Sequence, residues 1–164
     1  MTDWLPELIH FHDHGKDWAT YEAALYEAFK DDFVHAKPVY RGTALSMKRI
    51  PISKGKEATF WHIISDGADE ANRLINFRRC ERIRWARALV ENSEKPEVKM
   101  WVAEKSHENR IHLWLEEDDF VVVIADRGTY LLFWTAYHVD RDHQRRKLLR
   151  EYTEYQAKQK KQAP

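Results

Sequence analysis

The fold is decided by residues 98–139, which read VKMWVAEKSHENRIHLWLEEDDFVVVIADRGTYLLFWTAYHV. The stretch contains four runs rich in β-branched and aromatic residues: Val98 to Lys105, Arg110 to Glu116, Phe120 to Asp126 and Tyr130 to Val139. Short polar segments separate the runs, as is usual between neighbouring antiparallel strands, so the sequence predicts an antiparallel meander. The pieces VVVIA and LLFW are apolar on both faces, and we therefore expect helices on both sides of the sheet.

Two stretches before this segment have helical periodicity. Residues 17–33 place five apolar side chains at helical spacing, namely Trp18, Tyr21, Leu25, Ala28 and Phe29. Residues 78–93, RRCERIRWARALVENS, predict a second helix, because Ile83, Ala86 and Val90 recur on one side of it.

The segment between these helices has extended character. Residues 39–50, VYRGTALSMKRI, predict a strand, a turn and a second strand. A basic loop, SKGKEA, follows, and residues 59–65, TFWHIIS, predict a further strand. In that strand His62 shares a face with Phe60 and Ile64, so its imidazole needs either a partner in the core or a place in a concave site.

The last helical pattern runs from Asp140 to Tyr155. It is expected to dock on the sheet through its apolar side chains, Leu148, Leu149 and Tyr152. Residues 158–164 lack such anchors and are expected to be a flexible basic tail. The predicted fold is α+β, with N-terminal helices, a central, mostly antiparallel sheet of four or five strands, and a C-terminal helix, in a single globular domain over residues 1–157.

Composition narrows the class of protein. The 164 residues include 27 basic and 27 acidic ones, so net charge gives no general argument for binding nucleic acid or membranes. A single cysteine, Cys80, excludes an internal disulfide. The first residues do not read as a signal peptide, and no window reaches the roughly 20 apolar residues that span a bilayer. We expect a soluble, cytoplasmic protein without membrane contact.

Histidines near the N-terminus offer one functional hypothesis. His10, His12, Asp13 and His14 approach the H-x-H-x-D-H pattern of metallo-β-lactamase-type hydrolases, but one residue is missing before the aspartate. Asp13 or His14 can instead cap the helix that follows. We therefore expect neither a metal nor a cofactor, and we rank a small metal-dependent hydrolase third among three hypotheses.

Five arginines crowd the second predicted helix: Arg78, Arg79, Arg82, Arg84 and Arg87. Only Glu81 lies among them. Arg79 and Arg87 fall on or beside the apolar stripe, where an unpaired charge is very costly. Each therefore needs an internal ion-pair partner or belongs to an anion site, since guanidinium groups bind phosphate in a bidentate manner.

Polar side chains also gather along the last predicted strand. Arg127 precedes it at a turn, Thr135 and Tyr137 share one of its faces, and His138 follows near its far end. Polar groups at the end of an apolar strand are common in functional sites, although ordinary strand ends carry them too. His112 lies within an earlier run, where a histidine is usually structural.

The order of these elements resembles a known family. A helix, a GK-x-x-x-FWHI segment, an R-x-x-R-I-x-W helix, a meander and a TAY strand together resemble the phage and polymorphic-toxin branch of the barnase–EndoU–colicin–RelE-like nucleases. The matching residues are His62, Arg79, Glu81, Arg82, Arg127, Thr135 and Tyr137. The resemblance covers roughly residues 33–155 and implies a toxin-like endoribonuclease of a mobile element that cleaves RNA without a metal.

The resemblance also implies a chemistry. The ribose 2′-hydroxyl attacks the adjacent phosphorus, so the site needs a base, an acid for the departing 5′-oxygen and cations for the phosphorane. His62 suits proton transfer, Arg82 supplies charge, and Tyr137 orients a phosphate or serves as a weak acid. Substrate contacts fall to Lys56, Arg79, Arg127 and Thr135. His112 and His138 compete for the second acid–base role.

The main alternative is a non-catalytic interaction module, such as an immunity or adaptor-like protein of a mobile element. Seven tryptophans and an arginine-rich helix agree with it, because Trp and Arg are frequent interface anchors. The nuclease hypothesis predicts RNA as a partner, and an antitoxin or another protein as a second one. It requires His62 and the arginine helix to meet in one cleft.

Overall fold

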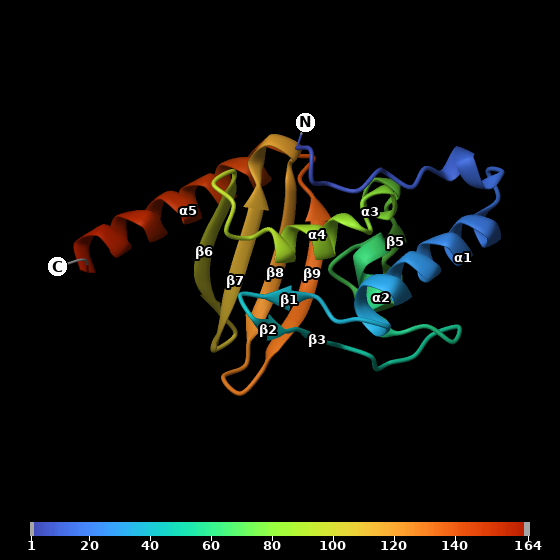
Figure 1. Ribbon diagram of the computed structural model, residues 1–164, viewed down its shortest axis with the longest axis horizontal. Helices are drawn as coiled ribbons and strands as arrows, with labels where there is room; N and C mark the ends of the chain where they lie inside the picture. The colour runs from blue at the N-terminus through green and yellow to red at the C-terminus, as the bar shows by residue number, and fades with distance from the viewer. Residues whose placement is uncertain (1, 163–164) are drawn as a thin grey trace.

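The computed structural model describes residues 2–162 and shows a five-stranded sheet with helices on both faces (Figure 1). The strand order is β3-β9-β8-β7-β6. Four strands are the predicted meander, with bounds β6 (Val98–Lys105), β7 (Glu108–Leu115), β8 (Phe120–Asp126) and β9 (Leu131–His138). They pair antiparallel in chain order, and β3 (Ser46–Met47) joins parallel to β9. The predicted α+β class and the predicted meander are confirmed.

A β-bulge in β9 decides which of its side chains face which side of the sheet. The register with β8 shifts between Phe133 and Thr135, so Trp134 is an extra residue on β9. As a result, Phe133 and Ala136 belong to the core beneath the N-terminal helices. Trp134 and Tyr137 pack against the core on the opposite face.

The N-terminal layer begins with a 3-10 turn, Phe11–His14, and α1 (Trp18–Phe29). Asp17 caps α1, because its carboxylate accepts hydrogen bonds from the backbone N–H and the hydroxyl of Thr20. A π-type turn, Lys30–Val34, extends the helix. The first predicted helix is therefore confirmed.

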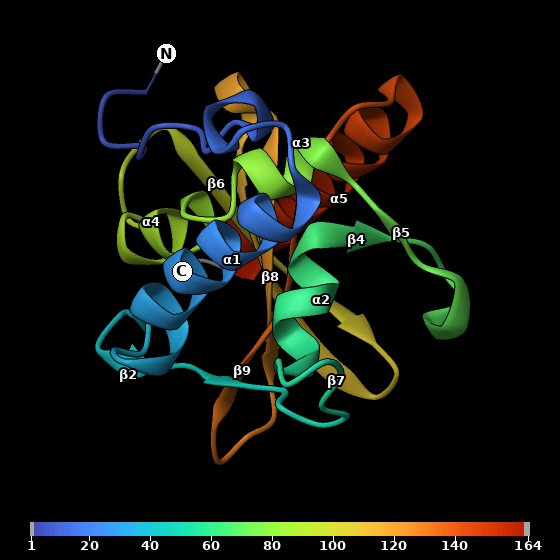
Figure 2. The same ribbon diagram turned by 90° about the vertical axis from the view of Figure 1, so that its right-hand side faces the viewer.

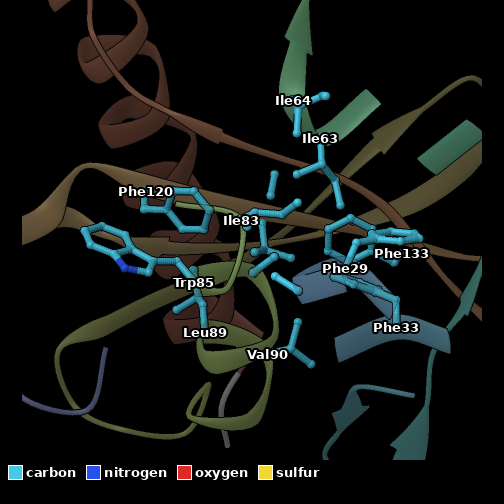
Figure 3. Close-up of a cluster of buried hydrophobic side chains, with 14 of the residues drawn as sticks. Phe29, Phe33, Ile63, Ile64, Ile83, Trp85, Leu89, Val90, Phe120 and Phe133 are labelled. Carbon is cyan, nitrogen blue, oxygen red and sulfur yellow. The ribbon is translucent and has the colours of Figure 1, made fainter. Parts of the chain in front are cut away.

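Each face of the sheet has its own hydrophobic core. Figure 3 shows the larger one, in which Phe29 and Phe33 of the N-terminal layer lie near Phe133 of the sheet. The smaller core lies on the opposite face, and its buried members are Trp101, Trp114, Val121, Val123, Val139 and Leu148. Two cores agree with strands that are apolar on both faces.

The segment TFWHIIS is helical, so the prediction of a strand there is wrong. α2 (Ala58–Ile64) buries Phe60, Ile63 and Ile64, which are three and four residues apart, as on one face of a helix. His62 lies on the half-buried side of α2. A short apolar run does not by itself distinguish a buried strand from a short helix, and here packing against β9 decides.

The predicted helix over residues 78–93 is two short helices joined by a turn. α3 (Phe77–Glu81) begins after Asn76, whose side chain accepts a hydrogen bond from the backbone N–H of Arg79, and α4 (Trp85–Glu91) follows. The buried side chains of this segment are Cys80, Ile83, Trp85, Ala86, Leu89 and Val90. These side chains span too wide an arc for one face of a straight helix. The turn between α3 and α4 lets the apolar side chains of both helices reach the core.

Two small hairpins flank these helices. β1 (Val39–Tyr40) and β2 (Thr43–Ala44) form the first, which confirms the predicted strand and turn, and β3 follows directly. β4 (Ser65–Asp66) and β5 (Leu74–Ile75) form the second, with a 3-10 turn, Glu70–Asn72, between them. The second hairpin was not predicted. It carries the chain from the end of α2 to the start of α3.

α5 (Asp142–Gln162) packs against the smaller core on the other face of the sheet. In Figure 2, α1 and α2 lie nearest the viewer and α5 lies behind them. Leu148 is buried in the smaller core, and Tyr152 and Tyr155 pack beside it. Leu149 is 43% exposed, so its predicted docking role is wrong. The helix presents this side chain to solvent because adjacent helical positions face different directions.

α5 also extends further than predicted. It projects past β6 in Figure 1 and remains helical over residues 158–162, where a flexible tail was expected, while residues 163–164 of that tail lie outside the described part of the chain. Its outer half is rich in lysine and glutamine, which are good helix formers. No helix between residues 2 and 162 is long and apolar enough to cross a membrane.

Candidate functional site

The candidate site lies along a free stretch of the edge of β9. β3 pairs only with Leu132 and Phe133 of β9, so the stretch from Thr135 to His138 has no neighbouring strand on that side among the described residues. α2 and α3 contact β9 instead (Figure 1). The C-terminal end of α2, the start of α3 and the C-terminal end of β9 therefore lie close together.

Arg79 of α3 connects these three elements. Its Nη1 donates to the carbonyl oxygens of Ser65 at 2.7 Å and of His62 at 3.3 Å, both at the C-terminal end of α2. Its Nη2 lies 3.4 Å from Oδ1 of Asp66. The guanidinium carbon is 5.8 Å from the ring centroid of Tyr137. Arg79 therefore lies beside the backbone of His62 and beside the ring of Tyr137.

A second arginine, which the sequence analysis did not single out, binds the same helix end. Arg73 donates from Nη2 to the carbonyl oxygens of Ser65 at 2.6 Å and His62 at 3.2 Å, and from Nη1 to that of Gly67 at 2.6 Å. Two cations thus satisfy carbonyls that a helix end leaves open, at the negative end of the helix dipole. Burial lowers the pKa of Arg79, and the neighbouring Arg73 adds to this, whereas Asp66 opposes it.

Tyr137 has a raised pKa. Burial raises its pKa to about 12, the nearby Glu151 of α5 adds to the rise, and Arg79 opposes it. The phenol therefore keeps its proton at neutral pH. Thr135 lies two residues earlier on the same face of β9, opposite Val123 of β8.

Arg82 and His138 lie together on the other face of β9. Arg82 donates from Nη1 to Glu81 at 3.2 Å and to the carbonyl oxygen of Arg78 at 3.1 Å, and its guanidinium lies 5.0 Å from the ring centroid of Trp85. Burial lowers the pKa of His138, and the charge of Arg82 lowers it further. Strand alternation separates His138 from Tyr137, so Arg82 does not join Arg79 at the tyrosine.

The two histidines proposed for a second acid–base role have different surroundings. His112 is only 4% exposed, its ring stacks on Trp101 at 4.9 Å, and its Nδ1 lies 3.2 Å from the carbonyl oxygen of Arg110. It is part of the smaller core region of the sheet. His138 is half-buried at the end of β9, close to the arginines of α3.

Two predicted substrate residues lie elsewhere. Lys56 precedes α2, at the end away from Arg79, with its Nζ 3.8 Å from Glu22 and 5.2 Å from the ring centroid of Tyr26. Arg127 is in the turn before β9, where its Nε lies 2.6 Å from Glu108. At about 3.3 Å per residue, β9 separates this turn from Tyr137 by about 20 Å. The seven predicted site residues therefore do not all lie together.

The N-terminal histidines do not converge. His10 stacks on His12 at 5.0 Å, while its Nδ1 lies 3.5 Å from Glu81 and His12 lies 3.3 Å from Asp13. Within residues 2–162, no group of three or more His, Cys, Asp or Glu side chains is arranged to hold a metal ion.

Sequence reasoning missed Arg73 and Asp66, which complete the surroundings of Arg79. Both belong to the polar stretch SDGADEANR, whose composition indicates only a loop. The hairpin of β4 and β5 folds this stretch back on itself and returns Arg73 to the end of α2. The composition of this stretch does not predict that Arg73 comes back to the end of α2.

Comparison with known proteins leaves the chain without a detectable relative: no family model, no curated protein and no solved structure matches it.

Proposed function

We propose that this protein is a metal-independent endoribonuclease of the toxin or mobile-element type, with His62, Arg79 and Tyr137 as its centre and Thr135 beside them. The observation that carries the proposal is the position of Arg79, which joins the end of α2 to the ring of Tyr137. The resemblance to the barnase–EndoU–colicin–RelE-like nucleases named the same three residues. Their proximity is what a shared cleft requires.

The proposed reaction is an in-line transfer at phosphorus. His62 accepts the proton of the ribose 2′-hydroxyl, the 2′-oxygen bonds to phosphorus, and the bond from phosphorus to the 5′-oxygen breaks. The hydroxyl of Tyr137 gives its proton to the departing 5′-oxygen. The products are a 2′,3′-cyclic phosphate and a free 5′-hydroxyl, so atoms and charge balance.

Arg79 supplies the fixed positive charge in this mechanism. Two backbone carbonyls hold its guanidinium, so the charge needs little reorganisation when the phosphorane forms. Its contact with Asp66 is long, at 3.4 Å, and an incoming phosphate oxygen can replace that carboxylate as the acceptor for Nη2. Arg82, on the other face of β9, contributes charge at longer range.

The test is incubation of the purified full chain with RNA in the presence and absence of a chelator. We expect cleavage that resists the chelator, leaves cyclic phosphate ends and stops when the scissile ribose is 2′-O-methylated. His62→Ala should lower the rate by roughly 10²–10⁴-fold, which is the usual contribution of a general base. Tyr137→Phe should lower it as well. His35→Ala, at an exposed histidine, is the matched control and should not change it.

A second candidate function is favoured by other observations. Arg82 and Arg127 are both engaged by glutamates, and several large apolar side chains are exposed, namely Ile50, Ile52 and Leu74. Engaged cations and exposed apolar groups agree with a non-catalytic interaction module that binds another protein. Absence of RNA cleavage by the wild-type protein, together with unchanged folding, would favour this function over the nuclease.

A further inference from the structure

An open groove of about 500 Å³ lies beside Arg79. The β4–β5 hairpin and the start of α3 form one side, and the link from β9 into α5 forms the other. Its lining includes Asp66, Leu74, Phe77, Arg78 and Gln144. Asp66 belongs both to this groove and to the surroundings of Arg79, so the groove leads directly to the candidate site.

Phe77 gives the groove a rigid aromatic surface. Its ring is nearly parallel to that of Tyr21, with 6.1 Å between centroids and 9° between planes, and it meets the ring of Phe11 edge-on at 5.3 Å. Tyr21 is fully buried, so its ring gives Phe77 a fixed packing partner. Phe77 itself remains 45% exposed. Trp18 also meets Phe77 edge-on at 6.2 Å, so the ring is held in place while its exposed part can stack with a planar ligand.

The polar groups of the groove add recognition of an anion. The side chains of Arg78 and Arg141 are 66% and 69% exposed, so both guanidinium groups can reach a ligand in solvent. Asp66 is held by Arg79, and Asp140 lies 4.0 Å from Arg141. The groove thus carries two arginines and two carboxylates, and Arg78 also lies 3.3 Å from Glu81. The two exposed guanidinium groups are the ones that can bind a phosphate.

We propose that this groove binds a nucleotide of single-stranded RNA, with its base stacked on Phe77 and its phosphates near Arg78 and Arg141. The inference rests on the proposed function and names how the substrate is held next to Arg79. Stacking accepts any base, because every base has a π-face. An unpaired strand is required, since a base within a duplex is already stacked on its neighbours.

The test measures binding without cleavage. A single-stranded oligoribonucleotide with 2′-O-methyl groups on every ribose lacks the nucleophile, and its affinity for the full chain is read by fluorescence anisotropy. Phe77→Leu should weaken binding by about 5- to 100-fold, the range for loss of one base–aromatic stack. Phe77→Trp, which keeps an aromatic ring at this position, should bind the oligonucleotide at least as tightly as wild type. Tyr130→Leu is the matched control, since Tyr130 is also 45% exposed but lies in the turn at the other end of β9.

A ladder of oligonucleotides, each with one abasic position, identifies the stacked base. In the wild-type protein, one position should lose affinity by the same factor as Phe77→Leu, and the Phe77→Leu variant should lose nothing further there. The inference is overturned if Phe77→Leu binds as tightly as wild type, or if the ladder affects both proteins equally. Should Phe77→Leu fail to fold, Phe77→Trp is compared with wild type on the same ladder: its larger ring should enlarge the loss at the stacked position, and equal losses in the two proteins would overturn the inference. Normal binding without cleavage would contradict only the proposed function, and cleavage with unaltered binding in Phe77→Leu would contradict only this inference.

Discussion

The guanidinium of Arg79 lies 5.8 Å from the ring centroid of Tyr137 while it donates to the carbonyl oxygens at the end of α2. One side chain therefore fixes the position of a helix end and faces the phenol of a strand. The two tasks are linked, because any movement of α2 relative to β9 must disturb this arginine. A variant at Arg79 should therefore alter stability as well as the proposed reaction.

We predict that Arg79→Lys destabilises the fold by about 1–3 kcal/mol, because a lysine cannot replace the forked charged donors and Arg73 alone then holds the carbonyls at the end of α2. The neighbouring Arg78→Lys is the control, since that side chain is 66% exposed and should change the free energy of unfolding by less than about 0.5 kcal/mol. Urea denaturation measures both. Equal effects in the two variants would contradict the capping role of Arg79.

We predict a loss of stability at alkaline pH that depends on Tyr137. Its pKa of about 12 lies above the ordinary value of about 10, so the folded state holds this proton more tightly than the unfolded state does. The resulting stabilisation is complete below pH about 10 and is lost as the pH rises towards about 12.

The Tyr137→Phe variant provides the measurement for this prediction. It has no phenol to ionise, so its free energy of unfolding should fall less steeply than that of wild type between pH about 10 and 12. Other tyrosines with a raised pKa, such as Tyr26, are present in both proteins and do not affect the difference. Parallel profiles for the two proteins would show that Tyr137 is not buried as described.

At acidic pH we predict a contribution from His138 with the opposite sign. Burial and the charge of Arg82 lower its pKa below the ordinary value of about 6.5. Its stabilisation is therefore present above pH about 6.5 and is lost as the pH falls through the lowered pKa. On acidification, the free energy of unfolding of His138→Gln should fall less than that of wild type. Urea denaturation of both proteins at matched pH values measures the difference. In Arg82→Gln, NMR titration should show the pKa of His138 moving up, and a downward movement would refute this account.

For α5 we predict that two adjacent leucines differ sharply. Leu148 is 5% exposed and packs in the smaller core, so Leu148→Ala should cost roughly 2–5 kcal/mol. Leu149→Ala, at a residue 43% exposed, should cost well under 1 kcal/mol. Truncation after Ala157 should leave the melting temperature almost unchanged, because Leu148, Tyr152 and Tyr155 remain. A large drop on truncation would show that the outer turns of α5 stabilise the fold.

The meander could be predicted from sequence because each of its strands is long and continuous. Runs such as FVVVIAD have few alternatives to a buried strand, and short polar turns fix their order. α2 could not be predicted in the same way. Its seven residues suit a strand by composition, and only packing against β9 selects the helix that groups Phe60 with Ile63 and Ile64.

The candidate site was predicted in part. Arg79 lies beside the backbone carbonyl of His62 and the ring of Tyr137, and His62 lies on a helix where a strand was expected. Lys56 and Arg127 were expected there and lie elsewhere, because the length of β9 and the direction of α2 carry them away. Such distances depend on tertiary structure, which residue types alone do not encode.

The partly unpaired edge of β9 has a consequence for the behaviour of the chain in concentrated solution. LLFWTAY is apolar, uncharged and free of proline, which are the features of segments that add to strands of other molecules. α2 and α3 cover the part of β9 that β3 leaves open, and so they protect the backbone of this segment from intermolecular pairing. Any change that loosens α3, including loss of the cap at Asn76, should therefore promote aggregation before it unfolds the sheet.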